Sequence, residues 1–322
     1  MLKRKIQTKG TLIANFPARS EIRRFVRIQV LKRLIRDAVH IFVKGSDKIA
    51  ILPLLGETYE PELSAYFKHS LLEGFGDSLI DVGANIGLVS CQEGDSFKRI
   101  FCYEPNYDVY QVLITNIAIS GLTHKTVAFD YGLGETEGEF DLLMPRDNFG
   151  AGFVRGLDNS YSDLVLARKD NSKVSEFSNY LSQRILVKNA AIELGNNFTE
   201  LSKQALSRGL LKIDVEGMEI SIIKKLIEVL PKNFSVRVLF ENHDEHLQQL
   251  RLTSEVMNRG THGYQAFHLV HRKPYGKTKS KLAKGFQALF NSSFIELHEL
   301  TGVNFPVGTI VLTLTPNSEP NG

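Results

Sequence analysis

Residues 79–87, LIDVGANIG, join a short apolar run to a carboxylate and two glycines. Gly83 can adopt backbone angles closed to other residues, so the chain can turn sharply there and leave room for a ligand against its backbone. Gly87 allows a helix to pack close to the preceding strand. We expect a strand, a glycine turn and a helix that begins near Ile86, whose free N–H groups favour a polar or anionic ligand. In α/β proteins this arrangement opens a nucleotide pocket at the carboxyl end of a strand.

Asp81 helps to select among nucleotide ligands. A dinucleotide fold uses G-x-G-x-x-G, but here Asp81 occupies the place of the first glycine and the pattern is D-x-G-x-x-x-G. A carboxylate repels a pyrophosphate and attracts a cation. S-adenosylmethionine carries an ammonium and a sulfonium and no phosphate, so it suits the turn better than NAD. The residues assigned to this cofactor are Asp81, Gly83, Ala84, Asn85 and Gly87.

A glycine turn after a strand is also common without a ligand, and a second acid strengthens the assignment. Glu104 follows Asp81 by 23 residues and ends the apolar run 99–103. An acid at the tip of the next strand is placed to accept the ribose hydroxyls, although alone it could be a solvated strand-end acid. Pro105 suits the first turn of the following helix, and Asn106 completes this part of the site. The third expected strand, 126–131, ends in Asp130 and Tyr131. We assign both to the cofactor site, where Asp130 could accept a hydrogen bond from the adenine amine.

Four titratable residues follow the expected fourth and fifth strands, 210–215 and 236–240. They are the candidate catalytic residues Asp214, Glu216, Glu241 and His243. Titratable groups that converge at strand ends beside a nucleotide cleft are what site chemistry requires. Asp214 is expected to face the methyl group of S-adenosylmethionine and the molecule that accepts it. His243 is a natural base near neutral pH.

Each of these roles has an alternative. Glu216 could orient Asp214, bind acceptor hydroxyls or cap the following helix. Glu241 could bind a metal or sugar hydroxyls, and His243 could be an ordinary rim histidine. The run HDEH at 243–246 is too generic to indicate a metal site, and Cys91 and Cys102 lack metal-ligand spacing, so we predict no metal.

Four blocks in order, DVGANIG, YEPN, YGLGETEGEF and LKIDVEGMEI, resemble the FkbM-type S-adenosylmethionine-dependent methyltransferases. The resemblance covers roughly residues 56–242. It implies an α/β, Rossmann-like class I methyltransferase fold, with a mostly parallel seven-stranded sheet and an antiparallel last strand. It also implies O-methylation of a hydroxyl on a sugar, glycan or polyketide-like metabolite, and an acid before the first strand, so Glu60 could line the cofactor pocket or simply favour a helix start.

Two departures from the family pattern concern the acceptor. Residues 157–181 are longer and more polar than expected, and AAIELGNNFTEL does not match the acidic stretch that usually precedes KIDVEG. Here we expect a strand at 185–194 and a short helix at 199–207. An insertion near 145–182 could be a lid over the acceptor or a tolerated surface loop. A basic insertion near 271–292 could be a solvated loop or a patch for an anionic acceptor.

The chain divides into a basic N-terminal extension, 1–55, and a methyltransferase domain, 56–322. Residues 1–50 hold thirteen Lys or Arg and three acidic residues. Within them, 21–43 has an amphipathic helical pattern, followed by a strand at about 48–55. This helix could contact an anionic membrane or an acidic glycan, or could dock on the domain with a solvated basic face.

Composition limits the remaining function classes. The 322 residues are 43% hydrophobic and 23% charged, with no apolar run of 18 or more. The first ten residues, MLKRKIQTKG, lack the apolar core typical of a signal peptide. We therefore expect a cytoplasmic protein, in possible peripheral contact with a membrane, that acts on a small molecule or glycan. The basic segments also suggest an RNA methyltransferase as an alternative function. The fourth strand has no NPPY-type motif, so we expect no nucleic acid as a partner. A non-catalytic scaffold is the third alternative.

Overall fold

The computed structural model describes residues 59–145, 152–155, 180–215, 217–242, 262–272, 294–300 and 305–317, together with the helical residues Val30 and Arg33. The rest of the basic extension, most of both expected insertions, and the predicted residues Glu216 and His243 lie outside the described residues.

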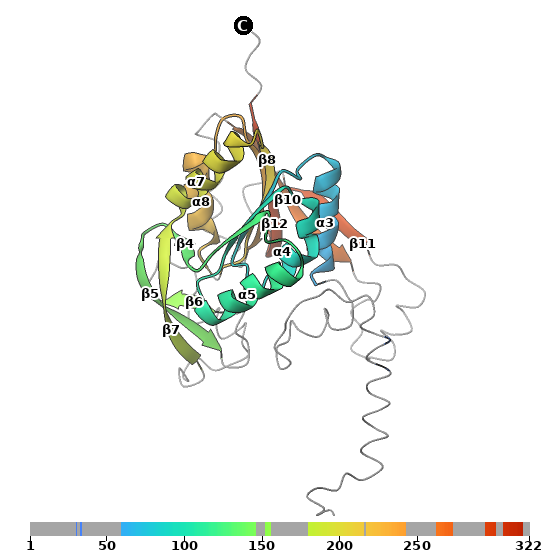
Figure 1. Ribbon diagram of the computed structural model, residues 1–322. Coiled ribbons are helices and arrows are strands. Elements are labelled where there is room, and N and C mark those ends of the chain that lie inside the picture. Colours follow the sequence, from blue (N-terminus) through green and yellow to red (C-terminus); the bar gives the residue numbers. More distant parts are fainter. Residues whose placement is uncertain are drawn as a thin grey trace, which may run out of the picture.

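Helices and strands alternate through much of the described chain, and its C-terminal part consists of strands (Figure 1). The α-helices are α3 (Pro61–Leu72), α4 (Leu88–Glu93), α5 (Tyr107–Ile119), α7 (Ala190–Lys203) and α8 (Glu219–Val229), with a 3-10 turn η2 (Gly94–Ser96). The strands are β1 (Ser78–Val82), β2 (Arg99–Tyr103), β3 (Thr126–Phe129), β4 (Gly132–Gly134), β5 (Gly138–Pro145), β6 (Phe153–Arg155), β7 (Tyr180–Asn189), β8 (Arg208–Ile213), β9 (Ser235–Asn242), β10 (His262–Arg272), β11 (Phe294–Glu299) and β12 (Gly308–Pro316).

The main sheet has the strand order β11-β10-β12-β9-β8-β1-β2-β3. Strands β3, β2, β1, β8 and β9 are parallel to their neighbours in this row, whereas β12 is antiparallel to both β9 and β10. The expected antiparallel last strand is therefore present, but the sheet is mixed, because the three strand pairs on the β12 side are antiparallel. Within the described residues this sheet has eight strands rather than the expected seven, because β11 adds an antiparallel edge strand beside β10.

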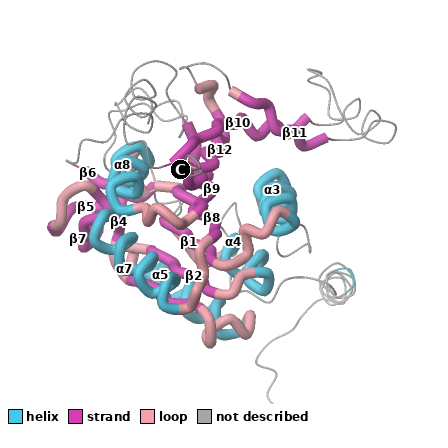
Figure 2. The backbone as a smooth tube through the Cα atoms, turned by 90° about the horizontal axis from the view of Figure 1, so that it is seen from above, coloured by secondary structure: helices cyan, strands magenta, loops and turns pink. Residues whose placement is uncertain are grey.

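Helices cover both faces of the main sheet, with α3 and α4 opposite α7 and α8 (Figure 2). Central strands such as β1 are buried along their whole length, as is typical of parallel strands between two helical layers. Because side chains alternate along a strand, Ile80 and Val82 pack with α7 and α8, whereas Leu79 packs with α3, α4 and α5. The same alternation places Asp81 on the side of α3 and α4, since it lies between Ile80 and Val82.

A second sheet, β4-β7-β5-β6, lies at the edge of the molecule beside α7 and α8 (Figure 1). Two elements near this sheet differ from the sequence expectations. The strand predicted at 185–194 ends at Asn189, and the helix predicted at 199–207 is the last part of the longer helix α7. Asn189 decides this boundary, because its side chain accepts hydrogen bonds from the N–H groups of Ala191 at 2.9 Å and Ile192 at 3.4 Å and so caps α7.

Among the described residues, no helix is both long and apolar enough to cross a membrane.

Candidate active site

The glycine turn after β1 brings the ends of β1, β2 and β8 together. The N–H groups of Gly83 and Ala84 each donate to the Tyr103 carbonyl at 3.0 Å. Gly83 has a φ of 78°, and a Cβ at this position would lie 2.1 Å from the Asp214 carbonyl oxygen. Only glycine combines this backbone angle with so close an approach of two strands. The turn therefore opens directly beside the end of β8.

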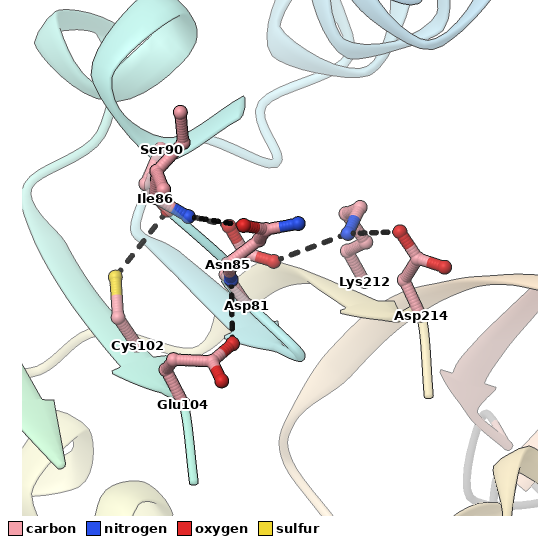
Figure 3. Close-up of polar contacts among 8 residues, drawn as sticks. All are labelled: Asp81, Asn85, Ile86, Ser90, Cys102, Glu104, Lys212 and Asp214. Atoms are coloured by element: carbon pink, nitrogen blue, oxygen red, sulfur yellow. Dashed lines mark hydrogen bonds and ion pairs between the residues drawn. The ribbon is translucent and has the colours of Figure 1, made fainter. Parts of the chain in front are cut away.

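Backbone donors hold both carboxylate oxygens of Glu104. Oε2 accepts from the Asn85 N–H at 2.9 Å (Figure 3). Oε1 accepts from the Asn106 N–H, also at 2.9 Å. Burial raises the pKa of Glu104 to about 7, although these two hydrogen bonds oppose the rise. Each carboxylate oxygen can accept a further hydrogen bond, so Glu104 can still receive ligand hydroxyls.

A cleft lies around this turn and encloses about 610 Å³, part of it open to solvent. Its lining residues come from the turn, the start of α5, the second sheet and the end of β8: Gly83, Asn85, Glu104, Pro105, Asn106, Val109, Leu142, Gly152, Phe153, Val154, Asp214, Val215 and Met218. We call it the first cleft. It combines apolar walls with a few polar groups, which is typical of small-molecule sites.

Two helix starts differ from the sequence expectation. Helix α4 begins at Leu88 rather than near Ile86, and the Ile86 N–H donates to the Asn85 side chain at 2.8 Å. Helix α5 begins at Tyr107, so Pro105 precedes the helix instead of lying in its first turn. Asn106 caps α5 by accepting from the N–H groups of two following residues, and its place in the cleft is thereby fixed.

Asp81, predicted to face the cofactor, lies outside the first cleft. Its side chain is completely buried. Ser90 Oγ donates to Asp81 Oδ2 at 2.7 Å, and Lys212 Nζ lies 3.4 Å from Oδ1 (Figure 3). The reason is the register of β1 and β8, which pairs Asp81 with Lys212 on the face that α4 covers.

Lys212 connects this buried carboxylate to the surface. Its Nζ also lies 3.0 Å from Asp214 Oδ2, and the Asp214 side chain is 52% exposed. Burial alone would lower the pKa of Lys212, but the carboxylates of Asp214, Asp81 and Glu60 raise it above its ordinary value. The ammonium therefore stays charged and holds the end of β8 in place.

A second cleft, of about 590 Å³ and partly open to solvent, shares Asp214 with the first. It is formed by the start of α3, the ends of β8 and β9 and the start of β12, and its lining residues are Glu60, Glu62, Leu63, Lys212, Ile213, Asp214, Leu239, Phe240, Glu241 and Thr309. Asp214 lines both clefts. The predicted catalytic residue Glu241 lines the second cleft and is absent from the first.

A family model described as Methyltransferase FkbM domain matches residues 81–265, more than half of the chain. The chain belongs to the FkbM methyltransferase family. A curated relative, Methyltransferase sdnD of Sordaria araneosa, is 28% identical over 156 residues, which cover 47% of this chain and 60% of the relative. The FkbM match includes the first cleft's turn and the ends of β8 and β9, whereas Glu60, Glu62 and Thr309 lie outside it.

Solved structures with a similar arrangement include two methyltransferases. The precorrin-6y C5,15-methyltransferase of Geobacter metallireducens is 12% identical, with 87% of this chain and 96% of that chain covered and a TM-score of 0.38. A SAM-dependent O-methyltransferase of Thermotoga maritima is 13% identical, with 82% and 68% covered and a TM-score of 0.36. The fold of this FkbM domain is assigned from the strand order of its main sheet, β11-β10-β12-β9-β8-β1-β2-β3.

Several predicted cofactor residues of this FkbM domain lie away from the first cleft. Asp130 is exposed, and the buried Tyr131 donates its hydroxyl to Glu193 at 2.8 Å. Ala84 is buried in the core with α3 and α4. Gly87 instead allows α4 and α5 to approach, since a Cβ there would lie 2.7 Å from Leu113. The structure thus brings Gly83, Asn85, Glu104, Pro105, Asn106 and Asp214 together, and places the other described candidates elsewhere.

Sequence reasoning missed the apolar walls and the lysine. Leu142, Phe153 and Val154 reach the first cleft from the second sheet, and no local motif marks them. Lys212 did carry a signal, because a charged residue inside an apolar strand is rarely buried without a partner. Among the described residues, no group of three His, Cys, Asp or Glu side chains is arranged to hold a metal ion.

Proposed function

We propose that this FkbM-family protein transfers the methyl group of S-adenosylmethionine to a hydroxyl oxygen of a small-molecule or glycan acceptor. The observation that carries the proposal is Glu104 at the tip of β2, held by two backbone N–H groups on the wall of the first cleft. An acid in this position suits a ribose, whose two hydroxyls can donate to its oxygens. The family match supports methyl transfer.

The residues of the first cleft fit this cofactor. Gly83 leaves the space that a Cβ would fill, so a ligand can lie against the turn. Val109, Leu142 and Met218 offer apolar surface for an adenine ring. Asp214 is a carboxylate on the cleft wall and favours a cationic ligand over a phosphate.

The protein has a limited chemical task in such a reaction. S-adenosylmethionine supplies a methyl group that is already activated by its positive sulfur. The chain must hold the acceptor oxygen in line with that methyl group, exclude water, and receive one proton from the acceptor. Positioning can contribute several kcal/mol to the barrier, and a general base typically adds a factor of roughly 10²–10⁴.

Isothermal titration of the folded protein with S-adenosylmethionine tests the first part of the proposal. We expect binding at one site, with a similar result for the product S-adenosylhomocysteine. A folded sample that gives no binding with either would contradict the proposal. Transfer of a deuterated methyl group to a panel of hydroxyl compounds, followed by mass spectrometry, tests the second part. Cofactor binding with no transfer to any acceptor would favour a non-catalytic scaffold.

A further inference from the structure

The second cleft lies where an acceptor could reach the first cleft. Asp214, at the end of β8, forms part of the wall of both. Carboxyl ends of parallel strands are where α/β folds place their ligands, and both clefts lie at that end of the sheet. A molecule in the second cleft and a cofactor in the first would therefore both lie next to Asp214.

We propose that the second cleft binds the methyl acceptor, that this acceptor is a hydroxyl-rich molecule without negative charge, and that Glu60 receives the proton of the reacting hydroxyl. The inference rests on the proposed function, because it assumes a methyl donor in the first cleft. It adds the site, the charge class of the substrate and the residue that manages the proton.

The charge of the second cleft restricts what can bind there. Among the described residues, its lining includes four carboxyl groups, those of Glu60, Glu62, Asp214 and Glu241, and one lysine. The ammonium of that lysine, Lys212, already pairs with Asp81 and Asp214, so it offers little charge to an anion. A phosphate or carboxylate on the acceptor would be repelled, whereas hydroxyl or ammonium groups can donate to these carboxylates. The cleft therefore disfavours nucleic acid.

The backbone positions Glu60 at the start of α3. Glu60 precedes the helix with φ 47° and ψ 69°. Its side chain makes no capping hydrogen bond and instead accepts a hydrogen bond from the Tyr59 hydroxyl. The preceding residue is anchored on α4, since the Tyr59 N–H donates to Gln92 Oε1 at 3.0 Å and Gln92 Nε2 donates to the Tyr59 carbonyl at 3.3 Å. The carboxyl is thus held in the cleft by fixed backbone on both sides.

The surroundings of Glu60 suit a base that works near neutral pH. Burial raises its pKa to about 7; Lys212 opposes the rise, and the carboxylates of Asp214, Glu62 and Asp81 add to it. The Tyr59 hydroxyl is a further titratable neighbour. Efficient general bases have pKa values close to the working pH. Glu241, by contrast, is exposed.

The proposed step is balanced in atoms and electrons. A bond forms between the acceptor oxygen and the methyl carbon. The bond between that carbon and sulfur breaks, and its electron pair stays on sulfur, which becomes a neutral thioether. The hydroxyl proton passes to the Glu60 carboxylate. No oxidant, reductant or metal is needed.

Crystals soaked with S-adenosylhomocysteine and a fragment panel test the site and its charge class. The panel contains hydroxyl-rich fragments that are neutral, amine-bearing or phosphate-bearing. We expect neutral or amine-bearing fragments in the second cleft, next to Asp214. Phosphate-bearing fragments in that cleft, fragments beside the cofactor sulfur in some other site, or no fragment in the second cleft would overturn the proposal. Absence of S-adenosylhomocysteine from the first cleft would contradict the proposed function instead.

Titration of Glu60 tests the proton acceptor without an activity assay. Carbon-13 NMR of protein labelled at glutamate carboxyls gives the titration of each group, and Glu60→Gln identifies the Glu60 signal by its loss. We expect a midpoint near the value of about 7 given above. The matched control Glu137→Gln, at an exposed glutamate before β5, should leave that signal unchanged. A Glu60 midpoint in the ordinary range of about 4.3 would overturn the base role.

Discussion

The two clefts that share Asp214 are built in different ways. The first depends on backbone: the glycine turn, the left-handed Asn85 and two N–H groups that hold Glu104. The second depends on side chains from α3, β8, β9 and β12, which lie as far apart in the sequence as Glu60 and Thr309. A backbone cradle needs particular residues at fixed spacing, whereas a charged surface can be assembled from any elements that meet. The site proposed for a common cofactor is therefore the one with a recognisable motif.

Lys212→Met should have the largest effect, because it affects both clefts. The substitution leaves the completely buried Asp81 without its ammonium and removes the ion pair between Lys212 and Asp214. Breaking a buried ion pair costs about 3–5 kcal/mol. Urea denaturation near neutral pH measures the loss. Lys98→Met is the matched control, since the Lys98 side chain is 65% exposed and its pair with Asp77 should contribute at most about 1 kcal/mol.

A double variant measures the interaction between Asp81 and Lys212 separately from the contribution of each side chain to stability. In Asp81→Asn with Lys212→Met, no buried carboxylate remains unpaired, so part of the stability lost in Lys212→Met should return. Additive losses in the double variant would show that the two side chains stabilise the fold independently.

Gly83→Ala should destabilise the protein by about 3 kcal/mol and abolish cofactor binding. The positive φ costs roughly 1–2 kcal/mol for alanine, and the new Cβ would lie 2.1 Å from the Asp214 carbonyl oxygen, so the strand ends must separate. Gly121→Ala is the matched control, because Gly121 has φ 73° but no atom within 4 Å of the added Cβ. Equal losses in the two variants would mean that strand spacing at Gly83 is unimportant.

Glu104→Gln should affect the first cleft alone. A glutamine amide group must replace one of the oxygens that accept the N–H groups of Asn85 and Asn106, so a donor faces a donor. We expect affinity for S-adenosylhomocysteine to fall about 30-fold, or roughly 2 kcal/mol, by isothermal titration. Glu241→Gln, in the second cleft, should leave this affinity within about twofold. If both variants bind alike, the two clefts do not have separate roles.

The smallest expected effect is the pH dependence of stability from Glu60. Its pKa is about 7 in the folded state and about 4.3 in the unfolded state. Between these values the folded state binds more protons, so the free energy of unfolding falls as pH rises from about 4.3 to 7. Glu60→Gln lacks this contribution and should gain about 1–2 kcal/mol relative to the wild type between pH 5.5 and pH 7. Parallel curves from urea denaturation would contradict the raised pKa.

Much of the fold follows from the sequence because parallel strands leave a strong apolar signal. The runs at 79–82, 99–103 and 210–213 each became a buried strand in the expected order. The second sheet was harder to predict. Its strand β7 alternates in burial and ends at a helix cap, so the apolar residues after Asn189 looked like a continuation of the strand.

The candidate site was predictable only where local spacing determines position. Glu104 and Asn85 lie together because the turn and the tip of β2 are neighbours in any such fold. Asp81 was misplaced because its orientation depends on the pairing of β1 with β8, which brings a lysine from 131 residues away. Likewise, the proximity of Glu60 to Asp214 depends on how α3 packs on the sheet, and no short pattern contains that information.

Asp214 belongs to both clefts, and this has a consequence for protein engineering. A library that randomises position 214 to change the accepted compound would alter donor affinity at the same time, so selections for new specificity would be confounded. Thr309, in the antiparallel strand on the far side of the second cleft, is absent from the first. Directed evolution should therefore begin there.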